Sequence, residues 1–165
     1  MTDDLPTEPL RAEHRQLLPH LRALDTAADE IDQWDRDELV HVLGEIVGFL
    51  REHLVPHATA EEQVLYPAVE EAMGAPGATD TMRADHSEIV TRIDRLADTA
   101  ADAAEGPWPD RDLARDLSHQ LVGLAAVLLL HFRKEEDVLL PVLDRTLSPA
   151  DASTLFARMA AVAHG

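Results

Sequence analysis

One polar pattern occurs twice in this chain of 165 residues, and its repetition restricts the possible folds more than any other feature. The first copy, HATAEEQVLYPAVE, covers residues 57–70, and the second copy, HFRKEEDVLLPVLD, covers residues 131–144. Both copies have a histidine four residues before a glutamate and ten residues before a proline. The chain is therefore expected to consist of two halves with the same local structure.

Apolar residues around both copies recur at the spacing of an α-helix. Leucines follow His14 at steps of three and four residues, which places them with the histidine on one helix face. Isoleucine, valine and leucine follow His86 in the same way. Each half is thus predicted to contain one such helix and then a longer helix, at about residues 36–73 and 110–146.

Turn-forming residues separate the predicted helices. Near the C-terminus, Ser148 begins the order Ser-Pro-Ala-Asp, which is typical of a helix start with Asp151 as the capping-box partner. The other separators are residues 26–36, GAPGATD at 74–80 (where Thr79 or Asp80 can cap the next helix) and EGPWPD at 105–110.

These elements predict an all-α fold. We expect an antiparallel up-and-down four-helix bundle built from two similar helical hairpins, plus a short C-terminal helix. The bundle would span about residues 10–146 and the C-terminal helix about 149–163, within a single domain of residues 1–165.

Charge and composition exclude several classes of site and partner. The chain has 14 Lys and Arg against 32 Asp and Glu, a net charge of −18, so its surface repels nucleic acid and anionic lipid. The absence of cysteine excludes disulfides, thiolate zinc sites and iron–sulfur clusters. The N-terminus lacks an apolar signal segment, and the longest apolar run, residues 121–130, is too short to cross a membrane. We therefore expect a cytoplasmic protein with neither nucleic acid nor membrane as a partner.

The polar residues of the repeat have the spacing of metal ligands. Residues four apart lie on one helix face, one turn apart, so His57 and Glu61 could bind one ion together. His131 and Glu135 have the same spacing. A buried His–Glu pair can also satisfy itself as an ion pair, which is a sufficient explanation for one copy alone. Two copies, each with a histidine in register on the preceding helix, favour a metal site.

A count of donors indicates two ions. Four imidazole nitrogens and two bridging carboxylates would give each ion two nitrogens and two oxygens, leaving positions for an oxo or hydroxo bridge and an exogenous ligand. This mixed set suits two non-heme iron ions, with manganese or zinc less favoured. The candidate metal residues are His14, His57, Glu61, His86, His131 and Glu135.

The same residues carry a resemblance to the hemerythrin-like, or HHE cation-binding, family. It covers about residues 10–145: His14, the first HxxxEExxLxP motif, His86 and the second copy of the motif. The resemblance implies a four-helix bundle around a non-heme di-iron centre, with the four histidines as terminal ligands and Glu61 and Glu135 as bridges.

Two departures separate this chain from the oxygen carriers of the wider family. Those proteins have a fifth histidine where this chain has Val90. They also bridge with an aspartate one residue further along the fourth helix, whereas this chain has glutamate at both Glu135 and Glu136. Reversible oxygen carriage is therefore not expected. The family's iron–sulfur repair members carry an N-terminal cysteine-containing segment, which is also absent here.

Several residues close to the motifs have two interpretations. Glu62 and Glu136 could accept hydrogen bonds from ligand histidines or form salt bridges in solvent. Tyr66 could lie near the centre or in the core with its hydroxyl satisfied. Pro67 and Pro141 are expected to bend or end their helices just beyond the metal.

The remaining histidines are less favoured as ligands. His53 lies four residues before His57, but the matching position in the second half is Val127, so an exposed helix residue is the preferred interpretation. Surface positions are expected for the histidines without a partner in register, which are His20, His41, His119 and His164.

The leading functional hypothesis is a di-iron protein that binds or reduces hydrogen peroxide, dioxygen or nitric oxide, with electrons from a separate donor. Peroxide removal of the catalase or peroxidase type is preferred, because the missing fifth histidine leaves more open coordination than a carrier needs. The alternative is a non-catalytic iron, oxygen or redox sensor, in which the C-terminal helix docks a partner. A third interpretation is a structural bundle with a relic motif.

Overall fold

The computed structural model describes residues 5–165, and these contain helices and connecting turns but no strand. This confirms the all-α class. The α-helices are α1 (Glu8–Glu30), α2 (Arg36–Phe49), α3 (Val55–Ala60), α4 (Tyr66–Met73), α5 (Asp80–Glu105), α6 (Arg111–Lys134), α7 (Leu140–Thr146) and α8 (Pro149–His164). Shorter elements are the 3₁₀ turn η1 (Ile31–Gln33) and the π-helical turns η2 (Leu50–Leu54), η3 (Glu61–Leu65) and η4 (Glu135–Leu139).

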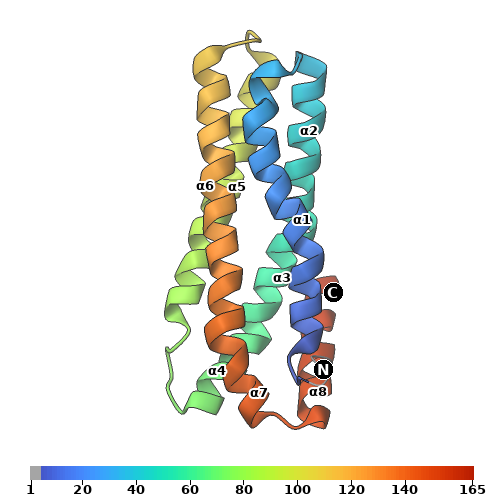
Figure 1. Ribbon diagram of the computed structural model, residues 1–165, viewed down its shortest axis with the longest axis vertical. Helices are drawn as coiled ribbons and strands as arrows, with labels where there is room; N and C mark the ends of the chain where they lie inside the picture. Colours follow the sequence, from blue (N-terminus) through green and yellow to red (C-terminus); the bar gives the residue numbers. More distant parts are fainter. Residues whose placement is uncertain (1–4) are drawn as a thin grey trace.

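The long helical segments lie side by side along the long axis of the molecule (Figure 1). Elements α2, α3 and α4 follow one another without a loop, as do α6 and α7, because η2, η3 and η4 join them. Consecutive long segments run in opposite directions, from α1 to the α2–α4 segment, α5 and the α6–α7 segment (Figure 1). The last helix, α8, packs against α3 and η3.

Two clusters of buried apolar side chains fill the space between the helices. One contains Leu54, Ile89 and Phe132, and the other contains Leu10 and Tyr66. Each fully buried leucine or phenylalanine contributes about 1.5–3 kcal/mol relative to exposure. Along each long segment, buried polar residues separate the two clusters: His14, His57, Glu61, His86, His131 and Glu135.

The helix starts follow the expected capping chemistry, with one difference. The Ser148 hydroxyl accepts from the backbone N–H of Asp151, and Asp110 caps α6 in the same manner. Thr79 precedes α5 but makes no side-chain cap; its hydroxyl donates to Glu70 instead. The first separator is shorter than predicted, because α1 and η1 continue through residues 26–33.

Prolines lie two residues beyond each π-helical turn. Pro56, Pro67 and Pro141 follow η2, η3 and η4, and the helices continue past all three. A proline removes one backbone hydrogen bond and its ring crowds the carbonyl four residues earlier. The wider π turn relieves that crowding. Of the two alternatives expected for Pro67 and Pro141, a bend or an end of the helix, an end at the proline is therefore contradicted.

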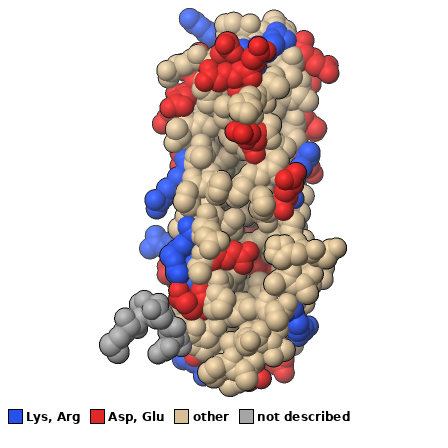
Figure 2. Space-filling view, turned by 90° about the vertical axis from the view of Figure 1, so that its right-hand side faces the viewer, with Lys and Arg blue, Asp and Glu red and all other residues tan. Residues whose placement is uncertain are grey.

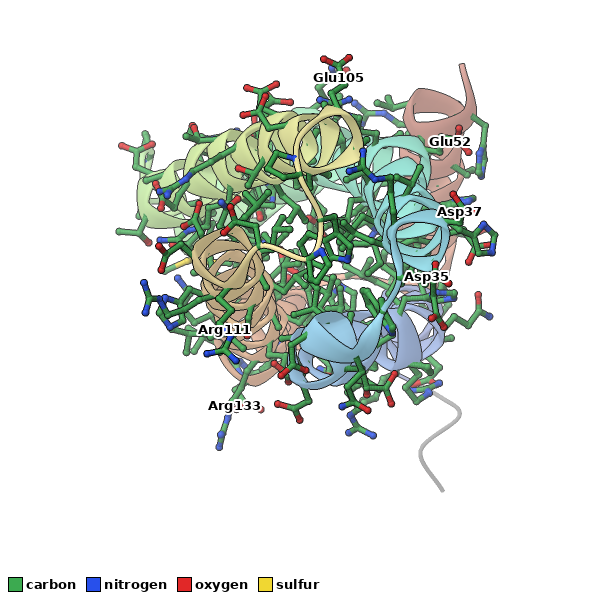
Figure 3. All side chains as sticks on the ribbon, turned by 90° about the horizontal axis from the view of Figure 1, so that it is seen from above. Asp35, Asp37, Glu52, Glu105, Arg111 and Arg133 are labelled. Atoms are coloured by element: carbon green, nitrogen blue, oxygen red, sulfur yellow. The ribbon has the colours of Figure 1, made fainter. Side chains whose placement is uncertain are left out.

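Apart from Glu61 and Glu135, no Asp, Glu, Lys or Arg side chain among the described residues is buried. Seen along the long axis, Glu105 and Arg133 point away from the centre (Figure 3). Acidic side chains gather at the end where α1 meets α2 (top of Figure 2). Among residues 5–165, one helical segment, Arg111–Thr146, is long and apolar enough to cross a membrane by length and composition alone. Its Leu117 is fully buried in the core, and central helices of packed bundles meet the same criterion.

Candidate metal centre

The six residues expected at the metal site meet in the interior of the molecule, and none is more than 4% exposed. Each long segment contributes, because the helical spacing turns these positions toward the common axis. The histidines come from α1 (His14), α3 (His57), α5 (His86) and α6 (His131), while Glu61 begins η3 and Glu135 begins η4.

The six side chains form two overlapping donor sets. In each set, one donor atom from every residue lies within 4.8 Å of all the others. Both sets contain the same two carboxylates, and each has its own pair of histidines. We call them the first set (His14, His57, Glu61, Glu135) and the second set (His86, His131, Glu61, Glu135).

The Glu61 carboxylate divides its oxygens between the two sets. Its Oε1 lies 2.9 Å from His57 Nε2 and 3.6 Å from His14 Nε2. Its Oε2 lies 3.3 Å from His86 Nε2. One carboxylate thus offers one oxygen to each histidine pair, as a bridge between two ions requires.

Glu135 makes the corresponding arrangement from the opposite helix. Its Oε2 lies 3.4 Å from His14 Nε2, and its Oε1 lies 3.4 Å from His131 Nε2. The two nitrogens of the second set, His86 Nε2 and His131 Nε2, are 2.9 Å apart. All these separations suit donors that share an ion.

Several of these donor atoms have no hydrogen-bond partner although they are buried. They come close to one another without the geometry of a hydrogen bond. Each buried polar atom left without a partner costs about 1–3 kcal/mol. A cation between them would satisfy all of them at once, so the residues fit a metal. The atoms are His14 Nε2, His57 Nε2, both carboxylate oxygens of Glu61 and Glu135 Oε2.

The outward nitrogen of every histidine faces a carboxylate. In the first set, His14 Nδ1 is 3.2 Å from Glu136 Oε1, and His57 Nδ1 is 3.0 Å from Glu13 Oε1. An ionised carboxylate only accepts, so Nδ1 carries the proton and a neutral ring keeps its Nε2 lone pair facing inward.

The second set repeats this arrangement. His86 Nδ1 is 2.9 Å from Glu62 Oε1, and His131 Nδ1 is 3.1 Å from Asp85 Oδ2. Lys134 also donates to Asp85. Of the two interpretations of Glu62 and its counterpart Glu136, the hydrogen bond to a histidine is therefore the one observed.

Sequence reasoning missed the other two carboxylates, Glu13 and Asp85. Both lie immediately before a histidine of the site, Glu13 before His14 and Asp85 before His86. Each accepts a hydrogen bond from the histidine of the next long segment, and not from the histidine beside it in the sequence. The repeated acid–histidine pair could have found them, but the crossing between helices is a tertiary feature.

Electrostatics favour positive charge at the centre. Burial acts to lower the pKa of His14, but the hydrogen bond to Glu136 and the nearby Glu61 carboxylate raise it to about 9. Burial opposes charge on His57 too, yet Glu61 and Glu13 raise its pKa well above the ordinary value. In Glu61 itself, burial is outweighed by the charge of His57, and its pKa is lowered well below the usual range. A bound cation would replace these protons.

An arginine side chain donates a hydrogen bond to the helix backbone beside Glu61 and another does so beside Glu135, and we call each arrangement an arginine clamp. The Tyr66 N–H donates to the Glu61 carbonyl, and the amide that would serve Glu62 in a π turn belongs to Pro67, which has no N–H. The guanidinium of Arg83 donates to the Glu62 carbonyl instead, at 3.0 Å.

The second half has the same clamp. Here Arg11 donates to the carbonyl of Glu136, at 3.4 Å, where Pro141 lacks the N–H. Arg11 also pairs with Asp144, just as Arg83 pairs with Glu70. A threonine, Thr7 or Thr79, donates its hydroxyl to the same carboxylate. The two clamps therefore hold Glu61 and Glu135 in matching positions.

The Tyr66 hydroxyl lies inside the site. Its side chain is fully buried, and its Oη donates to Glu135 Oε1 at 2.8 Å. The same oxygen is 3.2 Å from His86 Nε2 and 3.4 Å from His131 Nε2. Of the two interpretations of Tyr66, the position near the centre is the one observed.

The remaining histidines and Val90 lie outside the site. His53 is exposed and packs on Phe49, and the other histidines outside the two sets are exposed as well. Val90 is 38% exposed. Its neighbour Ile89 instead lines a cavity of about 10 Å³ beside the donor sets, together with Leu54, Leu128 and Phe132. Apolar side chains thus limit the space next to the donors to a very small ligand.

Comparison with known proteins agrees with this geometry. No curated protein and no solved structure matches the chain significantly. The family model described as the hemerythrin HHE cation-binding domain matches residues 5–143. That range contains all six expected ligands and both clamp arginines, and it covers most of the chain. The chain therefore belongs to the hemerythrin HHE cation-binding family.

Proposed function

We propose that the two donor sets hold two iron ions and that the protein binds or reduces a small oxidant there. The proposal rests mainly on one observation: Glu61 and Glu135 each place one carboxylate oxygen near the first histidine pair and the other oxygen near the second pair. In this proposal the four long segments form an antiparallel up-and-down bundle of two similar hairpins, and α8 is an addition to it. The family assignment supports cation binding, and the nitrogen and oxygen donors favour iron.

The protein's own residues orient the donors and exclude water. A bound iron pair would supply a redox centre and a Lewis acid. Glu13 and Asp85 hold the outward N–H of His57 and His131, which fixes the direction of each ring. Leu54 keeps the adjoining cavity apolar.

The size of that cavity bears on the substrate. A cavity of about 10 Å³ lined by His57, Ile89 and Phe132 admits at most a ligand of very few atoms without movement of side chains. Hydrogen peroxide, dioxygen and nitric oxide meet this condition. Peroxide reduction is our preferred activity, because the first set supplies four protein donors and so leaves two positions of a six-coordinate ion open. We also propose a cytoplasmic location without nucleic-acid or membrane partners, and the net charge of −18 disfavours binding to nucleic acid and anionic lipid.

Metal analysis and absorption spectra test the proposal. Metal-free protein is loaded with ferrous iron without air, desalted and then oxidised. Two irons per chain and absorption of an oxo-bridged di-iron centre are expected. The exposed His53→Ala variant is the matched control and should bind two as well. A protein that binds no iron or a single iron contradicts the proposal. Turnover of peroxide or nitric oxide above that of free iron then tests the activity.

A sensor is the second candidate function, and one observation favours it. Helix α8 packs against α3 and η3, the elements that carry His57 and Glu61. Its Leu155 and Met159 belong to the same apolar cluster as Ala60. Metal loading would then alter the docking of α8. Hydrogen exchange along α8, with and without iron, tests this. A large change in α8 without any turnover favours the sensor, and turnover with unchanged α8 favours the enzyme.

A further inference from the structure

We propose that the phenol oxygen of Tyr66 is a fifth protein donor to the ion of the second set, so that the two ions occupy unequal sites. The inference rests on the proposed function above, because it concerns how this chain holds the two ions. An interpretation of the chain's single tyrosine as ordinary core does not explain why its hydroxyl lies among the metal donors, whereas a role as a ligand does.

The distances carry the inference. Neighbouring donors on one octahedral ion with bonds of about 2.1 Å lie roughly 3 Å apart. Tyr66 Oη lies 2.8 Å from Glu135 Oε1, 3.2 Å from His86 Nε2 and 3.4 Å from His131 Nε2. The nitrogens of His86 and His131 are themselves 2.9 Å apart. The phenol oxygen is thus as close to three donors of the second set as they are to one another.

The π turn explains why this residue reaches the site. In a regular α-helix, residues five apart point roughly 140° away from each other. In η3 the N–H of Tyr66 donates to the carbonyl of Glu61, five residues earlier, so that about one turn separates the two residues. Tyr66 therefore lies on the same side of the helix as Glu61, and not on the outside.

The ring has little freedom to turn away. Tyr66 is fully buried, its ring stacks against the His86 imidazole with centroids 5.4 Å apart, and the Arg83 guanidinium lies over it. Ordering a side chain before an ion binds removes most of the entropy cost of recruiting it as a ligand.

The other half of the chain has no equivalent oxygen. The residue in the same place after η4 is Leu140, whose N–H donates to Glu135 just as that of Tyr66 donates to Glu61. The backbone is therefore repeated, and the phenol is not. The first set, with His14 and His57, keeps four protein donors, which leaves its ion as the one with more room for an exogenous ligand.

The phenol must lose its proton when its oxygen binds an ion. In the metal-free protein the Tyr66 hydroxyl donates its proton to Glu135 Oε1 in a hydrogen bond of 2.8 Å. A cation among these atoms reverses the sign of the local charge. A bond from the Tyr66 oxygen to an ion would release the O–H proton to the solvent, with no transfer of electrons.

Resonance Raman spectroscopy of the iron-loaded full chain tests the inference. Metal-free protein made with ring-deuterated tyrosine is loaded with ferrous iron and oxidised in air, and its iron content is measured. We expect two irons per chain, a phenolate-to-iron(III) charge-transfer band, and enhanced ring vibrations that shift on deuteration. Since the chain has one tyrosine, any such vibration belongs to Tyr66.

Two variants complete the experiment. Tyr66→Phe should keep both irons and lose the charge-transfer band, while Leu140→Met, at the matching position, should keep the band. Two irons per chain without enhanced tyrosine vibrations overturn the inference alone and leave Tyr66 as a hydrogen-bond donor to Glu135. A chain that binds no iron overturns the proposed function and the inference with it. If Tyr66→Phe fails to fold, the labelled natural chain still decides.

Discussion

The two halves of the chain place the same donors at the same points and differ in what surrounds them. Each half contributes two histidines, a bridging glutamate, an arginine clamp and a proline after a π turn. The first half alone has Tyr66, Pro56 and the extra π turn η2; the second has Leu140 and Leu130 at the positions that match the tyrosine and that proline. In our proposal the repeated residues hold the two ions, and the unrepeated ones make the two sites unequal.

The largest expected effect is on iron content, and it distinguishes the glutamates that belong to both donor sets from the histidines that belong to only one. Glu61→Gln should abolish binding of both irons, because that carboxylate offers an oxygen to each set. His57→Gln removes a donor from the first set only and should leave one iron per chain. Iron content per chain after desalting measures this, with His53→Gln as the exposed control. Two irons retained in Glu61→Gln would show that it is no bridge.

The carboxylates behind the histidines sharpen the comparison. The substitution Asp85→Asn removes the carboxylate charge and should weaken iron binding by about 10–100-fold, as expected for a residue that orients a ligand histidine. Glu13→Gln should cost less, since the Glu13 side chain is 49% exposed while that of Asp85 is 26% exposed and also held by Lys134. Competition with a chelator of known affinity measures both. Equal losses of iron affinity in the two variants would show that the burial of these carboxylates does not affect how strongly they support metal binding.

The arginine clamps should contribute to stability in both halves. Arg83→Met leaves the Glu62 carbonyl without its donor and removes one of the partners of the Glu70 carboxylate, and it should lower the free energy of unfolding by about 1–3 kcal/mol. Arg11→Met should have a similar effect. Urea unfolding of the metal-free protein measures the change. Arg95→Met breaks an exposed ion pair and should change stability by less than about 0.5 kcal/mol. A clamp variant as mild as this control would contradict the role.

A further expected effect is a pH dependence of the metal-free protein. The pKa of His14 is raised in the folded chain from an ordinary 6.5 to about 9, so its charged form stabilises the fold fully below about pH 6.5. That contribution is lost as the pH rises through about 9. Denaturant unfolding between pH 6 and 10 should show falling stability, and His14→Gln should flatten the curve. Iron loading at pH 7 should release protons, detected by calorimetry in buffers of different ionisation enthalpy. No release would place neutral histidines in the metal-free site.

Much of the fold follows from local pattern. The helical spacing after His14 and His86 predicts which faces are buried, and the Gly- and Pro-rich separators predict where the chain turns. The π turns do not follow from that pattern, because they depend on how a helix accommodates Pro67 and Pro141 when packing prevents it from ending. The continuation of α1 and η1 through residues 26–33 was missed for a similar reason: burial of Ala27 and Ala28 in the apolar core outweighs the acidic composition.

The site was predictable where the chemistry repeats. His57 with Glu61, and His131 with Glu135, are pairs set four residues apart, so one helix turn determines their direction. The positions of Glu13 and Asp85 were not predictable in this way, since each contacts a histidine on another segment and its partner depends on helix rotation.

The sequence by itself determined the all-helical class, the family, and the six residues expected to bind metal, because these depend on composition and on spacing along one helix. Only the tertiary structure decided how the carboxylates divide between two histidine pairs and which acid faces which ring. It also decided that Tyr66 points inward. The π turn rotates this residue relative to its position in a regular α-helix, and the α-helical spacing used to read the sequence does not include that rotation. Local spacing acts within one helix, whereas a metal centre between helices depends on their mutual rotation and depth.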